Sequence, residues 1–226
     1  MKVHAQRITH MVIINNISVF RMFVRLRELR SNEALCRYDN ITRKEDNPVS
    51  SLKDKTVTMA HGAGGKQTSE LIDQVFKAHF ANNDLTADDA AVLVPPAGRM
   101  AVSTDGFIVS PAFFPGGNIG KLSICGTVND LLMSGSVPKY LTCGCILEEG
   151  MDMDDLDRII ASMAETAEEA GVKIITGDTK VVDARGTEGG VMINTAGVGF
   201  ARGNVNCEPS LCQDGDMVIL SGTLGE

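Results

Sequence analysis

Four acidic positions carry residue types from which a chemical site could be built. Asp130 follows Asn129 within an otherwise apolar run, residues 120–138, that is predicted to be helical. A carboxylate there needs a partner, because an uncompensated buried charge is costly and is usually paired or bound to a metal. The other three positions each adjoin a short apolar segment typical of a strand, and they are Asp88-Asp89, Asp105 and Asp178.

Aspartates that converge on one cavity repel one another unless a cation lies between them. Magnesium bound together with a nucleotide is the natural candidate, since this ion takes carboxylate oxygens along with substrate phosphates. For a single aspartate at the end of a strand, a solvated turn residue or a helix cap is the simpler interpretation. The repetition of the pattern favours a metal-nucleotide site.

The composition excludes several classes of protein. The apolar and charged fractions, 43% and 22%, are those of a soluble globular protein. A formal net charge of -8 argues against a general nucleic-acid binder, which needs a basic face. No run reaches the roughly 18 consecutive apolar residues of a membrane span. We therefore expect neither nucleic acid nor a membrane as a partner.

The first 55 residues differ in character from the rest of the chain. Residues 1–50 hold 9 basic and 5 acidic side chains, whereas the remainder holds 12 basic and 24 acidic. Residues 8–29 mix apolar residues with arginines and suit a basic amphipathic helix or a targeting segment. Residues 31–55 lack a sustained apolar period and resemble linker. We expect 1–55 to be a basic, poorly ordered extension.

A glycine-rich loop, residues 61–66, precedes a well-marked helix. The helix is predicted from the apolar stripe Leu71, Ile72, Val75, Phe76 and Phe80, and Asn82-Asn83 closes it. A glycine loop at a helix N-terminus can hold phosphate through backbone N-H groups. A simple tight turn explains the same residues, since the loop matches neither the Walker A nor the dinucleotide pattern.

The remaining elements alternate between strands and helices. Asp152 is predicted to cap a helix that Gly171 ends. A buried strand over 172–176 then delivers Gly177 and Asp178 at its end, which is the usual place for site residues in such sheets. The other predicted strands are 90–94, 100–104, 139–147, 191–200 and 217–221.

The six cysteines form no CxxC pair, so we expect reduced, mostly buried thiols in a cytoplasmic protein. Cys143 and Cys145 would lie on one face of a strand and face the core.

Taken together, the motifs resemble the N-terminal part of the HypE family of hydrogenase maturation proteins, the carbamoyl dehydratases. The resemblance covers essentially all of the chain after residue 56. It rests on AHGAGGK (60–66), DDAAVL (88–93), STDGFIVSP (103–111), GKLSICGTVNDLLMSGSVPKYLT (120–142), GDTKVV (177–182) and DGDMVILSGTLGE (214–226).

The resemblance implies an α+β fold: an aminoimidazole ribonucleotide synthase (PurM)-like N-terminal domain whose mixed sheet is packed by helices. This domain would span residues 56–210, and residues 211–226 would begin a second α+β domain that the chain lacks. In the superfamily of aminoimidazole ribonucleotide synthase, the N-terminal domains commonly pair into a homodimer through their sheets. Its members bind ATP and Mg2+ between the N-terminal and the C-terminal domain.

The resemblance also implies site residues. The predicted metal ligands are Asp89, Asp105, Asp130 and Asp178. The predicted nucleotide-binding residues are Gly64, Gly65, Lys66, Asn129 and Thr179. In the family reaction, ATP drives dehydration of a thiocarboxamide on a C-terminal cysteine to a thiocyanate, the source of the iron cyanide ligands of [NiFe]-hydrogenase. Lys180 would neutralise charge on the phosphates, with a structural ion pair to a neighbouring carboxylate as the alternative. His61 would act as acid or base, with a hydrogen-bonded structural role as the alternative.

The resemblance implies partners as well, namely the carbamoyltransferase HypF and the HypC-HypD scaffold complex. The family's cysteine tail is absent from this sequence, so whether the chain itself is an enzyme stays open. Two alternatives remain: another ATP-using kinase or ligase of the superfamily, and a non-catalytic dimerisation or partner-binding module. Selenophosphate synthetase is disfavoured, since residues 60–66 contain no cysteine.

Overall fold

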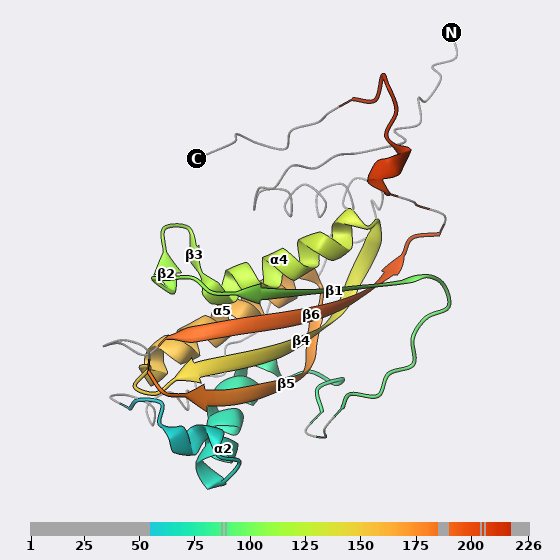
Figure 1. Ribbon diagram of the computed structural model, residues 1–226. Coiled ribbons are helices and arrows are strands. Elements are labelled where there is room, and N and C mark those ends of the chain that lie inside the picture. Colours follow the sequence, from blue (N-terminus) through green and yellow to red (C-terminus); the bar gives the residue numbers. More distant parts are fainter. Residues whose placement is uncertain are drawn as a thin grey trace, which may run out of the picture.

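The computed structural model describes residues 55–86, 88, 90–184, 190–203, 205 and 207–217. The predicted extension, apart from Lys55, and the predicted strand 217–221, apart from Met217, lie outside the described residues. Within the described ranges a twisted four-stranded sheet carries two long helices on one face (Figure 1).

The sheet is mixed and has the strand order β1-β6-β4-β5. These strands are β1 (Met100–Phe107), β6 (Val191–Ala201), β4 (Ser136–Glu148) and β5 (Lys173–Val182). β6 is antiparallel to both β1 and β4, whereas β4 and β5 are parallel. Parallel neighbours need a long crossover, which helix α5 (Met153–Ala170) supplies. The predicted α+β class with a mixed sheet is confirmed.

Helix α4 (Ile119–Met133) packs beside α5 to form the helical layer. The two helices lie very close at Gly120, where a Cβ atom would stand 2.3 Å from the carbonyl oxygen of Ile159. The predicted ends of α5 are confirmed. Asp152 Oδ1 accepts hydrogen bonds from the backbone N-H groups of Asp154 and Asp155, and Gly171 adopts a φ of 67°.

A helical segment precedes the sheet and packs against α5 and β5. It consists of η2 (Met59–Gly62), α2 (Lys66–Leu71), the π-helical turn η3 (Ile72–Phe76) and α3 (Lys77–Phe80). The predicted helix over 71–80 is confirmed. Asn82 ends it by donating from Nδ2 to the carbonyl oxygens of Phe80 and Ile174, 2.9 and 2.8 Å away. This contact ties the segment to β5.

Two smaller features complete the described chain. A hairpin of β2 (Phe113–Phe114) and β3 (Gly117–Asn118) projects between β1 and α4 (Figure 1). The short helix η4 (Pro209–Leu211) lies in the segment after β6.

Two predictions about strands are wrong. Residues 90–94 form no strand, and Val92 and Val94 are 94% and 95% exposed. The reason is that no neighbouring strand pairs with this segment in the described chain. Asp105 and Asp178 lie inside their strands rather than at the ends, because β1 continues to the buried Phe107 and β5 to Val182.

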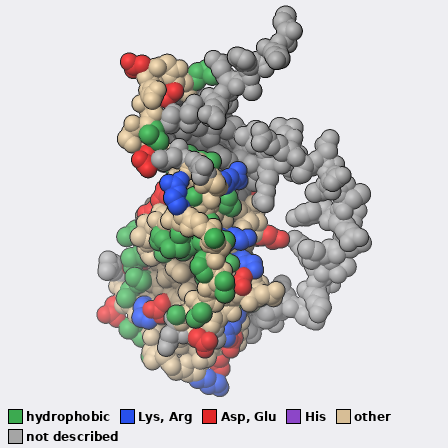
Figure 2. All heavy atoms as spheres, turned by 90° about the vertical axis from the view of Figure 1, so that its right-hand side faces the viewer, with side chains coloured by type: hydrophobic (Ala, Val, Ile, Leu, Met, Phe, Trp, Pro, Cys, Tyr) green, Lys and Arg blue, Asp and Glu red, His purple; other side chains and the backbone are tan. Residues whose placement is uncertain are grey.

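The second face of the sheet carries no helix of the described chain. Side chains alternate between the two faces of a strand, and in β6 the buried positions are those that face the helices. Hydrophobic side chains gather on the side of the molecule where the loop before β1 lies (Figure 2), and Val92, Val94, Met100 and Val102 are exposed. No helix in the described ranges is long and apolar enough to cross a membrane.

Candidate functional site

A cavity of about 480 Å³ lies between the N-terminal helical segment and the edge strand β5. Its apolar wall comes from the helical segment and the start of β5, with Ile72, Phe76, Phe80 and Ile174. Its polar wall comes from the glycine loop, the loop before β1, and the middle of β5, with Gly64, Asp88, Asp178, Thr179 and Lys180. The cavity therefore has one end suited to a flat apolar group and another suited to charged oxygens.

Asp178 and Lys180 form an ion pair at the polar end. Lys180 Nζ donates to both carboxylate oxygens of Asp178, at 2.7 Å to Oδ1 and 2.6 Å to Oδ2. This hydrogen bonding, assisted by the backbone N-H of Thr179, lowers the pKa of Asp178 from its ordinary value. Both side chains are open to solvent, with 69% of Asp178 and 61% of Lys180 exposed. The carboxylate is ionised and accessible to a cation.

The glycine loop contributes only in part to the cavity wall. Gly64 lines the cavity with a φ of 81°, and its N-H donates to Thr68 Oγ1 at 2.9 Å. Gly65 is the N-cap residue of α2. Lys66 is 88% exposed and lies 3.5 Å from Glu70 Oε1. Gly65 and Lys66 do not line the cavity.

His61 has a structural contact and lies outside the cavity wall. Its Nδ1 accepts a hydrogen bond from the backbone N-H of Thr58 at 2.9 Å, which forms a capping box at the start of η2. The acid or base role predicted for His61 stays a prediction.

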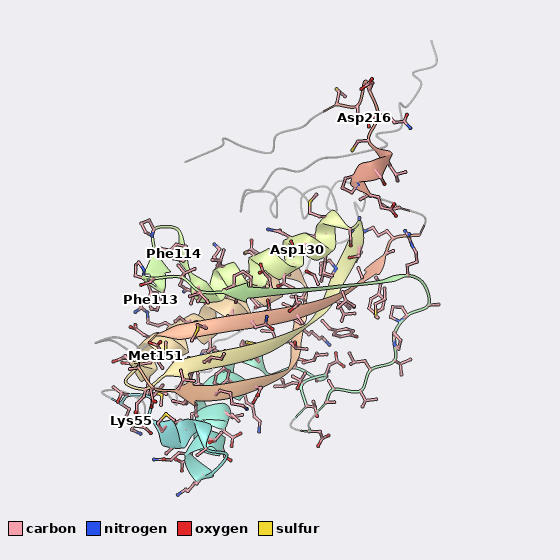
Figure 3. The ribbon with its side chains drawn as sticks, in the orientation of Figure 1. Lys55, Phe113, Phe114, Asp130, Met151 and Asp216 are labelled. Carbon is pink, nitrogen blue, oxygen red and sulfur yellow. The ribbon has the colours of Figure 1, made fainter. Side chains whose placement is uncertain are left out.

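Asp105 and Asp130 lie at a second place, the seam between β1 and α4. Figure 3 shows Asp130 on α4. Asp130 is exposed rather than buried, and its Oδ2 accepts a hydrogen bond of 3.0 Å from Ser103 Oγ. Asp105 Oδ2 lies 3.4 Å from where a Cβ on Gly126 would stand. The premise that Asp130 is a buried charge is wrong, because the C-terminal half of α4 leaves this position open to water. Asn129 precedes it on α4 and is half-buried.

The two places are far apart in one chain. Asp105 pairs in register with Thr195, which pairs with Cys143, which pairs with Gly177 beside Asp178. Three interstrand spacings make this row about 14 Å long. Asp105 also faces the helices, whereas the alternation along β5 turns Asp178 to the opposite face. Among the described residues, no group of three or more His, Cys, Asp or Glu side chains is placed to hold a metal ion. Asp89 lies outside the described residues.

Sequence reasoning missed two contributions. Ser103 stands two residues before Asp105 and hence on the same face of β1, a spacing that could have indicated it as a partner for an acidic group on α4. Phe76 and Phe80 belong to the apolar stripe that predicts the helix, and they also form part of the apolar wall of the cavity. Nothing in their spacing distinguishes the two roles.

Comparisons with known proteins identify relatives. The family model described as AIR synthase related protein, N-terminal domain, matches residues 87–201, just over half of the chain. The chain is 48% identical over 176 residues to carbamoyl dehydratase HypE of Escherichia coli K12, covering 75% of this chain and 52% of that protein. It is 48% identical over 171 residues to carbamoyl dehydratase HypE of Rhizobium leguminosarum, covering 75% of this chain and 49% of that protein.

Solved structures agree with these relatives. A crystal structure of hydrogenase maturation protein HypE in complex with ATP superposes with a TM-score of 0.62 at 51% identity, covering 66% of this chain and 44% of that one. A crystal structure of Escherichia coli HypE gives a TM-score of 0.57 at 50% identity, covering 61% of this chain and 44% of that one. The resemblance predicted from the motifs is confirmed. The chain spans about half the length of the curated relatives it matches.

Proposed function

We propose, from the premise that this chain belongs to the family of AIR synthase related N-terminal domains, that it supplies the N-terminal part of the Mg2+-ATP site of a HypE-type hydrogenase maturation factor. One observation carries the proposal. The cavity along β5 brings Gly64, Asp88, Asp178, Thr179 and Lys180 to one polar end, and a 51% identical relative of the same fold is known in complex with ATP.

The polar end of the cavity fits a magnesium nucleotide. Mg2+ in nucleotide sites is commonly held by one or two carboxylates together with substrate phosphates. Asp178 and Asp88 are exposed carboxylates of the cavity wall, and they would supply these oxygens. A bound magnesium would neutralise phosphate charge. Lys180 would leave Asp178 and contact phosphate oxygens, which its flexible stem allows.

The apolar end suits the adenine base. Phe76 and Phe80 are aromatic and lie with their ring centroids 6.3 Å apart in an edge-to-face arrangement, with Ile72 and Ile174 beside them on the cavity wall. Burial of a flat ring against such side chains is favourable. Gly64, whose positive φ turns the backbone, leaves no side chain at the entrance. We assign the remaining predicted contacts, those of Gly65, Lys66 and Asn129, to the complete protein.

A homodimer is part of the proposal. The open face of the sheet exposes Val102 and Ile146, and the extended segment before β1 exposes Val92 and Val94. Apolar patches of this kind mark interaction surfaces. Because Asp105 and Asp130 lie about three strand spacings from Asp178, they would share its cation only if a second copy brings its β1 edge to the β5 edge of the first.

The complete reaction is proposed at the level of the whole protein. There, ATP would activate the oxygen of a protein-bound S-carboxamide, and loss of phosphate would yield the thiocyanate used for iron cyanide ligands. HypF would load the carboxamide, and the HypC-HypD complex would receive the product. Lys180 is the residue of this chain that we propose to act on the reacting phosphates, with His61 as a further acid or base.

A second candidate function is a non-catalytic dimerisation or partner-binding module. The apolar open face favours it, since such a surface binds another chain whether or not the cavity binds a nucleotide. Among other ATP-using enzymes of the superfamily, a small-metabolite kinase or ligase would use the same cavity, so that alternative differs only in the acceptor.

Calorimetric titration of the whole chain with ATP, with and without Mg2+, tests the proposal. We expect magnesium-dependent binding that Asp178→Asn weakens tenfold or more, and that Asp155→Asn leaves unchanged. Asp155 is a matched control because it is an exposed aspartate paired with Arg158 outside the cavity. Absence of nucleotide binding by a folded dimer would favour the non-catalytic module.

A further inference from the structure

Two neighbouring cysteines of β4, one of which lines the cavity, form a feature that the proposed function does not use. Cys143 and Cys145 are alternate residues of β4 and point to the same face of the sheet. Their sulfur atoms lie 3.5 Å apart. The side chains are 4% and 1% exposed, so the pair is shielded from bulk solvent. Their predicted position, on one face and toward the core, is confirmed.

The cavity nevertheless reaches one member of this pair. Cys143 lines it together with Thr176, Gly177 and Thr179. Gly177 is the β5 neighbour of Cys143 in register, and having no side chain, it leaves the thiol uncovered on that side. A Cβ at Gly177 would stand only 2.4 Å from the carbonyl oxygen of Cys143, so a larger residue is excluded there. The cavity therefore gives a small ion access to Cys143.

Geometry favours ligation over disulfide formation. Alternate residues on a strand are about 6.6 Å apart, near the upper limit for the Cα atoms of a disulfide. Closing the bond would pull two residues of β4 together, and β4 is hydrogen-bonded to a strand on each side. Two metal-sulfur bonds of about 2.3 Å at a tetrahedral angle place the sulfurs about 3.8 Å apart. The present separation is within a few tenths of an ångström of that value.

We propose that Cys143 and Cys145 together form a dithiolate site for one thiophilic divalent cation of the zinc and cadmium class. Two thiolates and one divalent cation are electrically neutral, which lowers the cost of holding them in a buried place. Thiolate ligands select such ions over magnesium, which takes oxygen ligands. The site is thus distinct from the magnesium-nucleotide site, although it opens into the same cavity.

On the Cys143 side of the pair, the remaining coordination positions of a bound cation would face the cavity. In the described part of the chain no third His, Cys, Asp or Glu joins the pair. Water, or a donor group of a molecule in the cavity, completes the coordination, as at zinc sites that keep an open position. Thr179, the register neighbour of Cys145, is the nearest polar residue on this face of β5 and borders the open side.

Binding releases protons. Each thiol loses its proton when its sulfur bonds to the cation, and both protons pass to solvent through the cavity. Hydrogen bonding with Cys143, together with burial, raises the pKa of the Cys145 thiol well above its usual value. Apparent affinity therefore rises with pH, on the order of 100-fold per unit where both thiols are protonated, because two protons are displaced.

The test uses the whole chain with Cys36, Cys207 and Cys212 replaced by serine. Cys207 and Cys212 are exposed and would bind metal themselves, and Cys36 lies outside the described residues. This triple-serine chain, the parent for all further variants, is titrated anaerobically with Cd2+ in the presence of a non-thiol reductant. The thiolate-to-cadmium absorption band is recorded. We expect one equivalent to bind, with affinity falling at least tenfold in Cys143→Ala and in Cys145→Ala. Cys125→Ala is the control, because Cys125 is a buried cysteine on α4.

Measurements on the parent alone keep the proposal falsifiable if an alanine variant fails to fold. X-ray absorption at the cadmium edge should count two sulfur ligands, and titration in weak buffer should release two protons per cadmium. Absence of the band from the folded parent would overturn the proposal, as would its survival in a folded double variant. If treatment with a peroxide lowers the mass of the peptide that contains Cys143 and Cys145 by two hydrogens, the pair forms a disulfide instead.

Discussion

The two edges of the sheet both carry aspartates predicted to bind metal, yet they present them differently. At the β5 edge the N-terminal helical segment packs alongside the strand and encloses a cavity. There Asp178 accepts hydrogen bonds from Lys180 and Thr179 and shares the cavity wall with Gly64. At the β1 edge, within the described chain, only α4 lies beside the aspartates, and Asp130 meets Ser103 in the open. The aspartate at the β5 edge therefore lines a cavity, whereas the aspartates at the β1 edge lie on the surface of the described chain.

This difference separates a cavity that the described chain forms by itself from two aspartates, Asp105 and Asp130, that would need a second chain to complete a site. A cavity concentrates a ligand because several elements converge on it. Asp105 and Asp130 have no such convergence, although the seam holds both in defined positions through Gly126 and Ser103. The exposed apolar face next to β1 is the surface at which the proposed homodimer would cover this edge.

The largest expected effect comes from mixing chains that are damaged at different edges. Asp178→Asn and Asp105→Asn should each weaken Mg2+-ATP binding tenfold or more, about 1.4 kcal/mol. If a site combines Asp178 of one copy with Asp105 of another, exchange of subunits at equal amounts makes half of the dimers mixed. Each mixed dimer then holds one site with both aspartates intact, so about a quarter of all sites recover.

The number of high-affinity sites in the mixture, measured by calorimetry, decides this point. A mixture that binds no better than its parents would mean that the two edges do not combine across copies. Separate loss in each variant would then indicate two independent contributions.

Two glycines test how each edge is supported. A Cβ at Gly62 would stand 2.7 Å from the backbone nitrogen of Val181 on β5, and one at Gly126 would stand 2.7 Å from the Phe107 ring on β1. Gly62→Ala and Gly126→Ala should each lower the free energy of unfolding by about 1–3 kcal/mol through overpacking. Gly62→Ala should also weaken nucleotide binding more than Gly126→Ala does, because Gly62 lines the cavity itself, whereas Gly126 acts on binding only through Asp105.

Chemical denaturation with calorimetry measures both quantities. Gly106→Ala is the control, since no atom lies within 4 Å of the added carbon, and it should change the free energy of unfolding by less than about 0.5 kcal/mol. Equal effects of Gly62→Ala and Gly126→Ala on binding would contradict the separation of the two edges.

Ser103→Ala tests the β1 edge more gently. It removes the hydrogen bond to Asp130, which contributes about 0.5–1.5 kcal/mol to holding that side chain in place. We expect Mg2+-ATP binding to weaken several-fold while the midpoint of unfolding stays close to that of the unaltered chain. In an Asp130→Asn background the same substitution should have no further effect on binding. A full additional loss there would mean that Ser103 acts elsewhere.

The smallest expected effect concerns the ion pair at the β5 edge. The folded pKa of Asp178 is lowered by Lys180, so the pair stabilises the fold above the unfolded pKa of about 3.9 and loses this contribution as pH falls through the folded pKa. Since both side chains are mostly exposed, the contribution should stay below about 1 kcal/mol. NMR titration of the carboxyl groups should show that the pKa of Asp178 rises in Lys180→Met. An Asp178 pKa that stays the same in this variant would contradict the pairing.

Much of the fold could be predicted from local patterns. Asp152 and Gly171 mark the ends of α5 because an N-cap acceptor and a left-handed glycine act within a few residues. Alternation along 191–200 predicts a strand with one buried face, and β6 has it. The segment 90–94 has the same apolar character but forms no strand, since pairing depends on a neighbour that no local pattern supplies.

The candidate site divides in the same way. Motifs that run together in sequence, such as Gly177 to Lys180, lie together in space, because one strand carries them past one cavity. Asp105, Asp130 and Asp178 could not be assigned to one place from their types. Whether they converge depends on strand order and on which face each residue occupies.

By itself, the sequence determined the family, the α+β class and the chemical types available for a magnesium nucleotide, since these follow from residue identity and short-range spacing. Only the tertiary structure decided that, among the described residues, a cavity lies at the β5 edge while Asp105 and Asp130 at the β1 edge are exposed. It also decided that Cys143, with the sulfur of Cys145 beside its own, borders that cavity. The physical reason is that enclosure depends on which elements pack together over long separations in the chain, as when Asn82 bonds to Ile174.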